Sequence, residues 1–210
     1  SPWEHRQMNI DKAFKDGELE ELMLKAQQSN WNNTYFKHYV GMSTKNKGVL
    51  GEAFVEKLFR AKGIEVLPPT NPGHDRIIGG HKTEIKFSLA NSPLDKKSDK
   101  RLIVPDQFTY NHIACDKDWY RFVFCGVNPA SSHDPSKVLA HPKHRALSEL
   151  RLYFMEKSDF IEYMSTQNTS LFSRQQGGEK GGNDDYMLAG MNKFYRLIDL
   201  PFVKEVEGNW

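Results

Sequence analysis

The sequence predicts an α/β fold in a single domain, and three observations support this. Residues 47–89 have the pattern of one amphipathic helix followed by three short strands, with Gly and Pro between them. Residues 120–127, YRFVFCGV, are a nearly continuous apolar run, which is typical of a strand buried on both faces. Of the 210 residues, 38% are hydrophobic and 12% aromatic, which is enough apolar material for one core.

The N-terminal part of the chain predicts helices. Residues 10–28 carry apolar side chains at helical spacing, interrupted by Gly17, so one helix or two are expected. A clearer helix is predicted over residues 49–62, where apolar side chains around Phe54 recur every three or four residues. Gly63 should end this helix.

Three short strands follow the helix. Residues 64–67 are stopped by two prolines, and residues 75–78 are stopped by Gly79 and Gly80, which predict a hairpin turn into the strand of residues 83–89. Alternate residues of a strand point to opposite faces. In the last strand, one face carries Glu84, Lys86 and Ser88, and the other carries the core residues Thr83, Ile85, Phe87 and Leu89.

The second half of the chain predicts further elements. They are a short strand over 102–104, a helix over 106–113, the buried strand 120–127, a strand over 150–155, and a helix over 158–164 capped by Ser158. Residues 165–185 are rich in Gly, amides and hydroxyls and predict a long flexible loop. The apolar C-terminal segment is expected to close the domain as a strand or a helix.

Two carboxylates and a lysine mark a candidate site. Asp75 opens one strand, and Glu84 and Lys86 share a face of the next. Carboxylates a few ångströms apart repel each other unless a cation lies between them. Oxygen ligands of this kind suit Mg²⁺, for which Mn²⁺ can substitute. A lysine beside such a metal can orient or help deprotonate a water, which predicts phosphodiester hydrolysis.

These residues resemble the signature of a known family. Glu52 on a helix, then Asp75, then Glu84-Ile85-Lys86 are similar to the motif of the PD-(D/E)XK nuclease superfamily, over about residues 45–126. That superfamily includes type II restriction endonucleases and Holliday-junction resolvases. The chain departs from the motif at His74, where proline often precedes the aspartate.

The resemblance implies a restriction-endonuclease-like mixed central sheet flanked by helices, and Mg²⁺-dependent cleavage of nucleic-acid backbones. It implies that Asp75 and Glu84 hold the metal with the carbonyl of Ile85, and that Lys86 positions or activates the attacking water. Glu52 would support the site or a second ion. Glu56, one helical turn further on, is the alternative helix glutamate.

The resemblance favours sequence-specific double-strand cleavage of the type II restriction kind. A junction resolvase or DNA-repair nuclease is the alternative within the superfamily. A non-catalytic DNA-binding module with a structural acidic pair is the alternative outside it. A surface salt-bridge ladder on an edge strand would explain Glu84 and Lys86 without any site. The expected parts are an N-terminal helical extension (1–44), a catalytic core (45–164), and a recognition loop with the closing segment (165–210).

Several polar residues are candidate contacts to double-stranded DNA. Lysines contact phosphates, whereas Arg, Asn and Gln read base edges in the major groove. The candidates are Lys47, Ser88, Asn91, Lys96, Lys97, Gln107, Asn168, Arg174, Gln175 and Gln176. Solvated loops explain the lysines nearly as well, and a disordered insertion explains the loop 165–185 nearly as well.

The net charge and the lengths of the apolar runs indicate which partners the protein could have. The net charge of +2 supports nucleic acid only weakly, because acidic metal ligands offset a basic rim. No stretch reaches the apolar length of a membrane span, and the first residues lack an apolar signal region, so a cytoplasmic location is expected. Two cysteines make no disulfide framework. The sequence is compatible with a homodimer.

Overall fold

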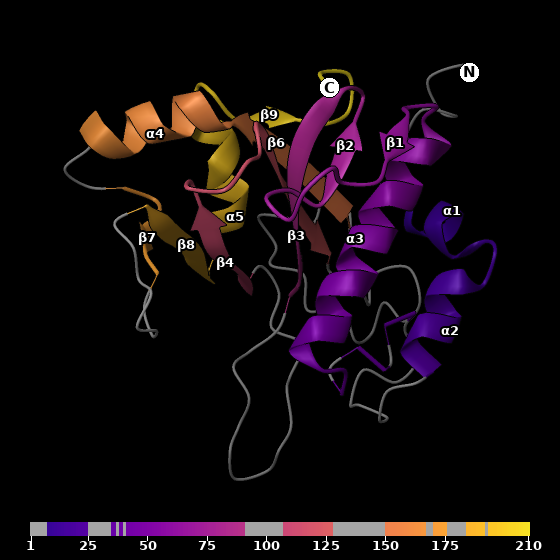
Figure 1. The fold of residues 1–210 in the computed structure, drawn as a ribbon. Helices are drawn as coiled ribbons and strands as arrows, with labels where there is room; N and C mark the ends of the chain where they lie inside the picture. Colours follow the sequence, from indigo (N-terminus) through magenta and orange to yellow (C-terminus); the bar gives the residue numbers. More distant parts are fainter. Residues whose placement is uncertain are drawn as a thin grey trace, which may run out of the picture.

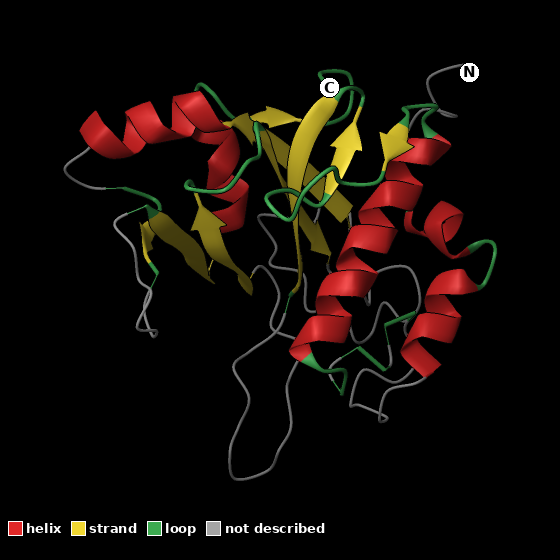
Figure 2. Cartoon of the chain, in the orientation of Figure 1, coloured by secondary structure: helices red, strands yellow, loops and turns green. Residues whose placement is uncertain are grey.

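A computed structural model of the chain describes residues 8–24, 35–36, 38–39, 41–90, 107–127, 150–166, 170–175, 184–191 and 193–210. The helices are α1 (Ile10–Phe14), α2 (Glu18–Leu24), α3 (Thr44–Ala61), α4 (Lys157–Thr166), α5 (Lys193–Arg196) and the 3₁₀ helix η4 (Leu197–Asp199). The strands are β1 (Val66–Leu67), β2 (Arg76–Ile78), β3 (His81–Leu89), β4 (Gln107–Ala114), β5 (Arg121–Val127), β6 (Leu150–Glu156), β7 (Ser173–Arg174), β8 (Asp185–Met191) and β9 (Lys204–Glu205). Figures 1 and 2 show their arrangement.

The strands form two sheets. A six-stranded sheet has the order β1-β2-β3-β5-β6-β9, and a three-stranded sheet has the order β4-β8-β7. In the large sheet β3 and β5 run parallel, with Glu84 opposite Phe122, while its other pairs are antiparallel. The predicted α/β class and the mixed central sheet are therefore confirmed.

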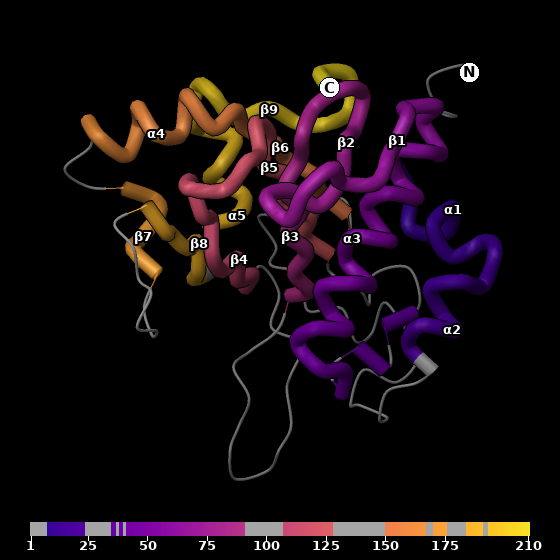
Figure 3. Tube along the Cα trace, viewed as in Figure 1, coloured from indigo at the N-terminus to yellow at the C-terminus, as the bar shows by residue number. Residues whose placement is uncertain are grey.

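The large sheet separates two apolar cores. The core on one side joins α1 and α3 to alternate residues of β5, among them Val123 and Cys125. The core on the other side joins Phe122 and Phe124 of β5 to the small sheet, α4 and α5. Strand β5 is thus buried on both faces, as predicted. Figure 3 shows helices α1, α2 and α3 on one side of the large sheet, and α5 with the small sheet on the other.

The N-terminal helices follow the prediction, with one difference in length. Gly17, at a φ of 77°, separates α1 from α2. Helix α3 begins at Thr44, five residues before the predicted start. Ser43 explains the difference, because its hydroxyl caps the helix by accepting a hydrogen bond from the Asn46 N–H at 3.2 Å.

Gly51 lets α3 approach β3 closely. A Cβ at this position would lie 2.6 Å from Cβ of Phe87, so only glycine fits at this contact. The next residue of α3 is Glu52, and the neighbour of Phe87 in β3 is Lys86. Close packing of the helix on this strand therefore brings two candidate site residues toward each other.

The predicted helix over 106–113 is wrong, since residues 107–114 form strand β4. Its buried residues Phe108 and Tyr110 alternate as in a strand, but a bulge then shifts the next buried residue to Ile113. The extra residue gives Tyr110 and Ile113 the three-residue spacing of a helix, which explains the error.

Two further predictions need correction. Ser158 lies inside α4 and is not its cap, because α4 begins at Lys157, whose N–H donates to the Tyr120 carbonyl. The predicted flexible loop 165–185 contains the end of α4, strand β7 and the start of β8. Strand β7 forms because it pairs with β8 through Ser173 and Arg174, which a local loop signal does not reveal.

The closing segment is confirmed as strand and helix, since β8, α5 and β9 all form and β9 pairs with β6 at the edge of the large sheet. The predicted strand over 102–104 lies outside the described residues. In the part of the chain that the structure describes, no helix combines the length and apolarity needed to cross a membrane.

Candidate active site

Three elements bring three carboxyl groups together. Asp75 directly precedes β2, and its Oδ2 accepts a hydrogen bond from the backbone N–H of Ile85 at 2.7 Å. The Asp75 side chain is also hydrogen-bonded to Glu52 of α3 and to Glu84 of β3. Glu84 is only 5% exposed. The predicted residues Glu52, Asp75 and Glu84 therefore form one cluster centred on Asp75.

The cluster shares protons. Burial, the hydrogen bond to Asp75 and repulsion from its charge raise the pKa of Glu84 to about 9 and that of Glu52 to about 8. Burial also disfavours the ionised form of Asp75, but the hydrogen bonds from Glu84, Glu52 and the Ile85 N–H outweigh it and lower the Asp75 pKa. At neutral pH the cluster is therefore one carboxylate that accepts hydrogen bonds from two protonated carboxyls.

The helix glutamate of the site is Glu52 rather than Glu56. Oε1 of Glu56 lies 3.3 Å from Nε of Arg76 and 3.8 Å from Nη2 of Arg60. Glu52, one turn earlier, bonds to Asp75, and its Oε1 is 3.7 Å from Nη1 of Arg76. Arg76 thus lies within ion-pair distance of both glutamates, and Glu52 is the one that also bonds to Asp75.

Lys86 lies beside the carboxyls, as predicted. Its ammonium favours the ionised forms of Glu52, Asp75 and Glu84 through its positive charge. Lys117, in the turn after β4, acts on Glu84 in the same direction. The site thus combines acidic side chains with nearby lysines.

A cavity of about 710 Å³ opens at this cluster. The predicted site residues that line it are Lys47, Glu52, Asp75, Ile85, Lys86, Ser88, Gln107 and Gln175. Helix α3 and strand β3 form one wall, and β4 with Gln175 forms the other. Glu84 does not line the cavity and lies behind Asp75. Residues predicted from distant parts of the sequence thus meet around one space.

The chemistry of the donor set fits a divalent metal ion. Carboxylate and carbonyl oxygens are ligands that Mg²⁺ prefers, and Glu52, Asp75, Glu84 and the Ile85 carbonyl supply them. Within the described ranges, no group of three or more His, Cys, Asp or Glu side chains has the arrangement of a metal site. The protonated carboxyls instead bond to Asp75, so metal binding requires their deprotonation.

The predicted DNA contacts fall into two groups. Lys47, in the first turn of α3, lies 5.3 Å from the ring centre of Tyr39 on the cavity wall. Ser88 is buried, and its hydroxyl accepts from the Thr109 N–H and donates to the Leu89 carbonyl, so it links β3 to β4. The predicted contacts Asn91, Lys96, Lys97, Asn168 and Gln176 lie outside the described residues.

Three of the residues expected to contact DNA, Gln107, Arg174 and Gln175, lie in or next to the small sheet. Oε1 of Gln175 accepts a hydrogen bond from the backbone N–H of His112 at 2.8 Å, so this amide supports the bulge in β4. Arg174 is an exposed residue of β7. Gln107 begins β4 and lines the cavity, although it was predicted on a helix.

Three residues near the site were missed from the sequence. Arg76 follows Asp75 directly. The two glutamates one turn apart on α3, Glu52 and Glu56, could have indicated a basic partner such as Arg76. Lys117 and His112 had no such signal, because the turn and the bulge that place them depend on pairing between β4 and β8. His112 lines the cavity and pairs with Asp185, with 2.9 Å between Nδ1 and Oδ2.

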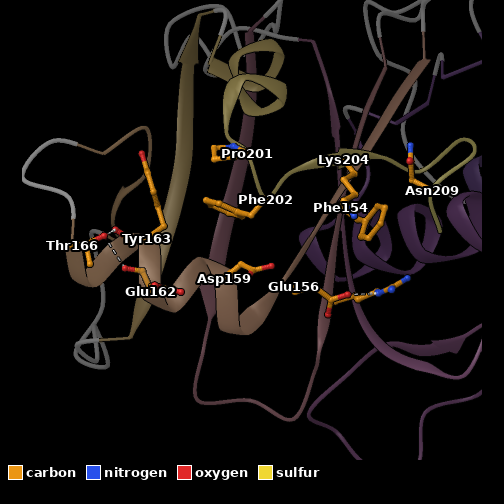
Figure 4. Close-up of a pocket in the computed structure, with 11 residues that line it drawn as sticks. Phe154, Glu156, Asp159, Glu162, Tyr163, Thr166, Pro201, Phe202, Lys204 and Asn209 are labelled. Atoms are coloured by element: carbon orange, nitrogen blue, oxygen red, sulfur yellow. Dashed lines mark hydrogen bonds and ion pairs between the residues drawn. The ribbon is translucent and has the colours of Figure 1, made fainter.

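A second cavity of about 610 Å³ lies between α4 and the segment around β9 (Figure 4). Its arginine, Arg121, is paired with Glu156 at 2.7 Å, and its guanidinium lies 4.9 Å from the ring centre of Phe154 and 4.7 Å from that of Trp210. The cavity has carboxylates, but they do not bond to one another. This cavity therefore lacks the proton-sharing cluster of the first.

Comparison with protein-family models, with curated proteins and with solved structures finds no match for this chain. Function is therefore inferred from the chemistry of the site.

Proposed function

We propose that this protein is a Mg²⁺-dependent endonuclease that hydrolyses DNA phosphodiester bonds, in the manner of the PD-(D/E)XK superfamily. One observation carries the proposal: Glu52, Asp75 and Glu84 meet beside Lys86, at a cavity. A mixed sheet with a helix packed on the site-bearing strand is the architecture that this motif implies. The absence of a match in the comparisons leaves the chemistry of these four residues as the main support.

The donor groups define how a metal would be held. Asp75, Glu84 and the Ile85 carbonyl would provide its oxygen ligands, and Glu52 would support them or a second ion. When bound, Mg²⁺ or Mn²⁺ supplies positive charge that stabilises the developing charge on phosphate and lowers the pKa of water. Arg76 keeps Glu52 oriented toward the cluster while pairing with Glu56.

Lys86 has a separate role in this proposal. Its ammonium donates hydrogen bonds to the attacking water or to a phosphate oxygen, and so orients the reacting groups. Lys86 lines the cavity, and it lies on the strand that also bears Glu84, the proposed metal ligand. Ser88, two residues further along that strand, fixes the position of β4 opposite.

Within this class we infer cleavage of double-stranded DNA of the type II restriction kind. The support is the small sheet, which adds a second wall carrying Gln107 and Gln175 to the cavity. A structure-selective nuclease would require a junction or a flap as substrate. A purely DNA-binding module would bind without Mg²⁺ and cut nothing.

The test is incubation of the protein with plasmids of varied sequence in Mg²⁺, in Ca²⁺ or in excess chelator, followed by sequencing of the ends. We expect cleavage in Mg²⁺ at a preferred sequence, binding without cleavage in Ca²⁺, and no cleavage with chelator. Ca²⁺ is larger and has looser coordination geometry, so it holds substrate without supporting the reaction. Efficient cutting in chelator would refute the metal-dependent mechanism.

The Glu52→Gln and Glu56→Gln variants provide a matched comparison. Both variants remove one carboxyl group from α3, at positions one helical turn apart, but only Glu52 bonds to Asp75. Cleavage should fall in Glu52→Gln and persist in Glu56→Gln. Equal loss in both variants would mean that the helix, rather than the cluster, limits activity.

A further inference from the structure

His112 has an unusual backbone at the wall of the cavity. Its φ is 57°, and among the described non-glycine residues it alone has a positive φ. It sits at the bulge of β4 between Tyr110 and Ile113. Bulges beside active sites re-aim side chains, and strained backbone persists only where its surroundings hold it. The contacts that hold His112 therefore indicate whether the bulge has a structural role or a role in binding.

Two neighbours fix His112 in place. Gln175, which follows β7, accepts its backbone N–H, and Asp185 of β8 pairs with Nδ1 of its ring. The Asp185 side chain is only 16% exposed, whereas that of His112 is 58% exposed. Oδ1 of Asp185 is buried and has no hydrogen-bond partner among the described residues. A largely buried carboxylate thus holds an exposed ring in place.

The anchored ring is available to a ligand. Because Nδ1 is directed to Asp185, Nε2 is the ring nitrogen left for a contact, and in the protonated ring it is a donor. His112 lines the same cavity as Glu52, Asp75 and Lys86 but belongs to the opposite wall. A DNA strand in this cavity would place the acidic cluster on one side of its phosphates and His112 on the other.

We propose that His112 is a substrate-contacting residue whose Nε2 donates a hydrogen bond to a DNA phosphate oxygen, and that Asp185 positions it. This inference rests on the proposed nuclease function. The strained bulge, the buried partner and the shared cavity together favour a binding role over a purely structural one. A residue that only terminated strand pairing would not need a buried carboxylate to orient its ring.

The His112→Asn variant tests this contact. Asparagine tolerates the left-handed backbone and keeps the N–H that bonds Gln175, but it lacks the imidazole. His81→Asn is the matched control, because His81 lies at the start of β3 against Trp210 and does not line the cavity. Affinity for a duplex is measured in Ca²⁺ by fluorescence anisotropy over a series of salt concentrations, and the single-turnover rate is measured in Mg²⁺.

A lost charge-assisted phosphate contact should weaken DNA binding by about tenfold. The slope of log affinity against log salt should become shallower by about 0.9. The melting temperature should stay near that of the wild type. Asp185→Asn should give a smaller loss of affinity in the same direction, while His81→Asn should change neither affinity nor slope.

The outcomes separate this inference from the proposed function. Wild-type cleavage with unchanged affinity and salt slope in His112→Asn would overturn the phosphate contact and leave the nuclease function standing. An absence of Mg²⁺-dependent cleavage by the wild type would overturn both. If His112→Asn does not fold, His112→Gly is used instead, because glycine adopts a positive φ without strain.

Discussion

The two cavities use acidic residues in opposite ways. In the cavity of Figure 4, Glu156 is neutralised by Arg121, whose guanidinium also lies against the rings of Phe154 and Trp210. At the Asp75 cluster the carboxyls bond to each other, and two of them have pKa values raised to about 8 and 9. Satisfied ion pairs of the first kind hold a fold together. In the proposed function, the carboxyls of the Asp75 cluster would exchange their protons for a cation.

The largest effect is expected from Asp75→Asn, which sharpens this contrast. The amide keeps an acceptor for the Ile85 N–H but removes the charge at the centre of the cluster. Cleavage in Mg²⁺ should fall by about a thousandfold or more, on the scale of losing one main stabiliser of transition-state charge. The measurement is the single-turnover rate on plasmid DNA.

Glu156→Gln is the control for Asp75→Asn. It removes a carboxylate from the other cavity, and cleavage should stay within a few-fold of the wild type. A wild-type rate for Asp75→Asn, or a similar loss in both variants, would erase the distinction between the two cavities.

The next largest effect is expected from Lys86→Ala. Loss of a group that positions or activates water should slow the chemical step by about a hundredfold or more, with little change in DNA affinity. Lys82→Ala is the matched control, because Lys82 lies on the same face of β3 but is paired with Asp118 at 2.8 Å. If affinity fell and the single-turnover rate did not, Lys86 would be a phosphate contact instead.

A third prediction concerns pH. The folded-state pKa values of Glu52 and Glu84 lie above the ordinary value of 4.5, so the metal-free folded state binds more protons than the unfolded state. Stability from this source is fully present below about pH 4.5 and is lost as pH rises through about 8 and 9. The melting temperature of metal-free protein should therefore fall over this window.

Glu84→Gln should flatten that pH dependence, since it removes one of the two groups. Melting is followed by circular dichroism in chelator at several pH values. A melting temperature that rises between pH 6 and pH 9 in the wild type would contradict the raised pKa values, and with them the proton-sharing cluster.

The smallest effect is expected from a pair of glycine substitutions in α3. Gly51→Ala places a methyl group against Phe87, and such overpacking should destabilise the protein by about 1–3 kcal/mol. Gly48→Ala meets no atom within 4 Å and should stabilise the helix by about 0.5–1 kcal/mol. Urea unfolding measures both, and equal changes of the same sign would show that α3 does not pack on β3 as described.

The wall of the cavity formed by α3 and β3 could be predicted from the sequence to a larger extent than the wall formed by β4. Asp75, Glu84 and Lys86 were found because one hairpin with a regular alternation places all three within 12 residues of each other. Helix α3 was also predicted, because the spacing of its apolar residues is visible in a short stretch of sequence. Glu52 and Glu56 could not be separated from spacing alone, because the choice depends on Arg76, which reaches α3 only in the folded hairpin.

The opposite wall depends on contacts that a local pattern does not contain. The bulge in β4 gives its buried residues a helical spacing, so residues 106–113 were predicted as a helix. Strand β7 consists of two residues, which pair with a strand more than ten residues later. His112 and Asp185 are 73 residues apart, so their pairing is visible only once β4 and β8 lie side by side.

The most direct test of the central claim is the release of protons when Mg²⁺ binds in the absence of DNA. Metal ligands must be deprotonated, and Glu52 and Glu84 hold protons near pH 7, so the wild type should release up to about two protons per ion. Calorimetric titrations in buffers of different ionisation enthalpy measure this number. Release should drop by about one proton in Glu84→Gln and stay unchanged in Glu56→Gln. Binding of Mg²⁺ without proton release, or no binding at any pH up to 9, would contradict a metal site at the Asp75 cluster.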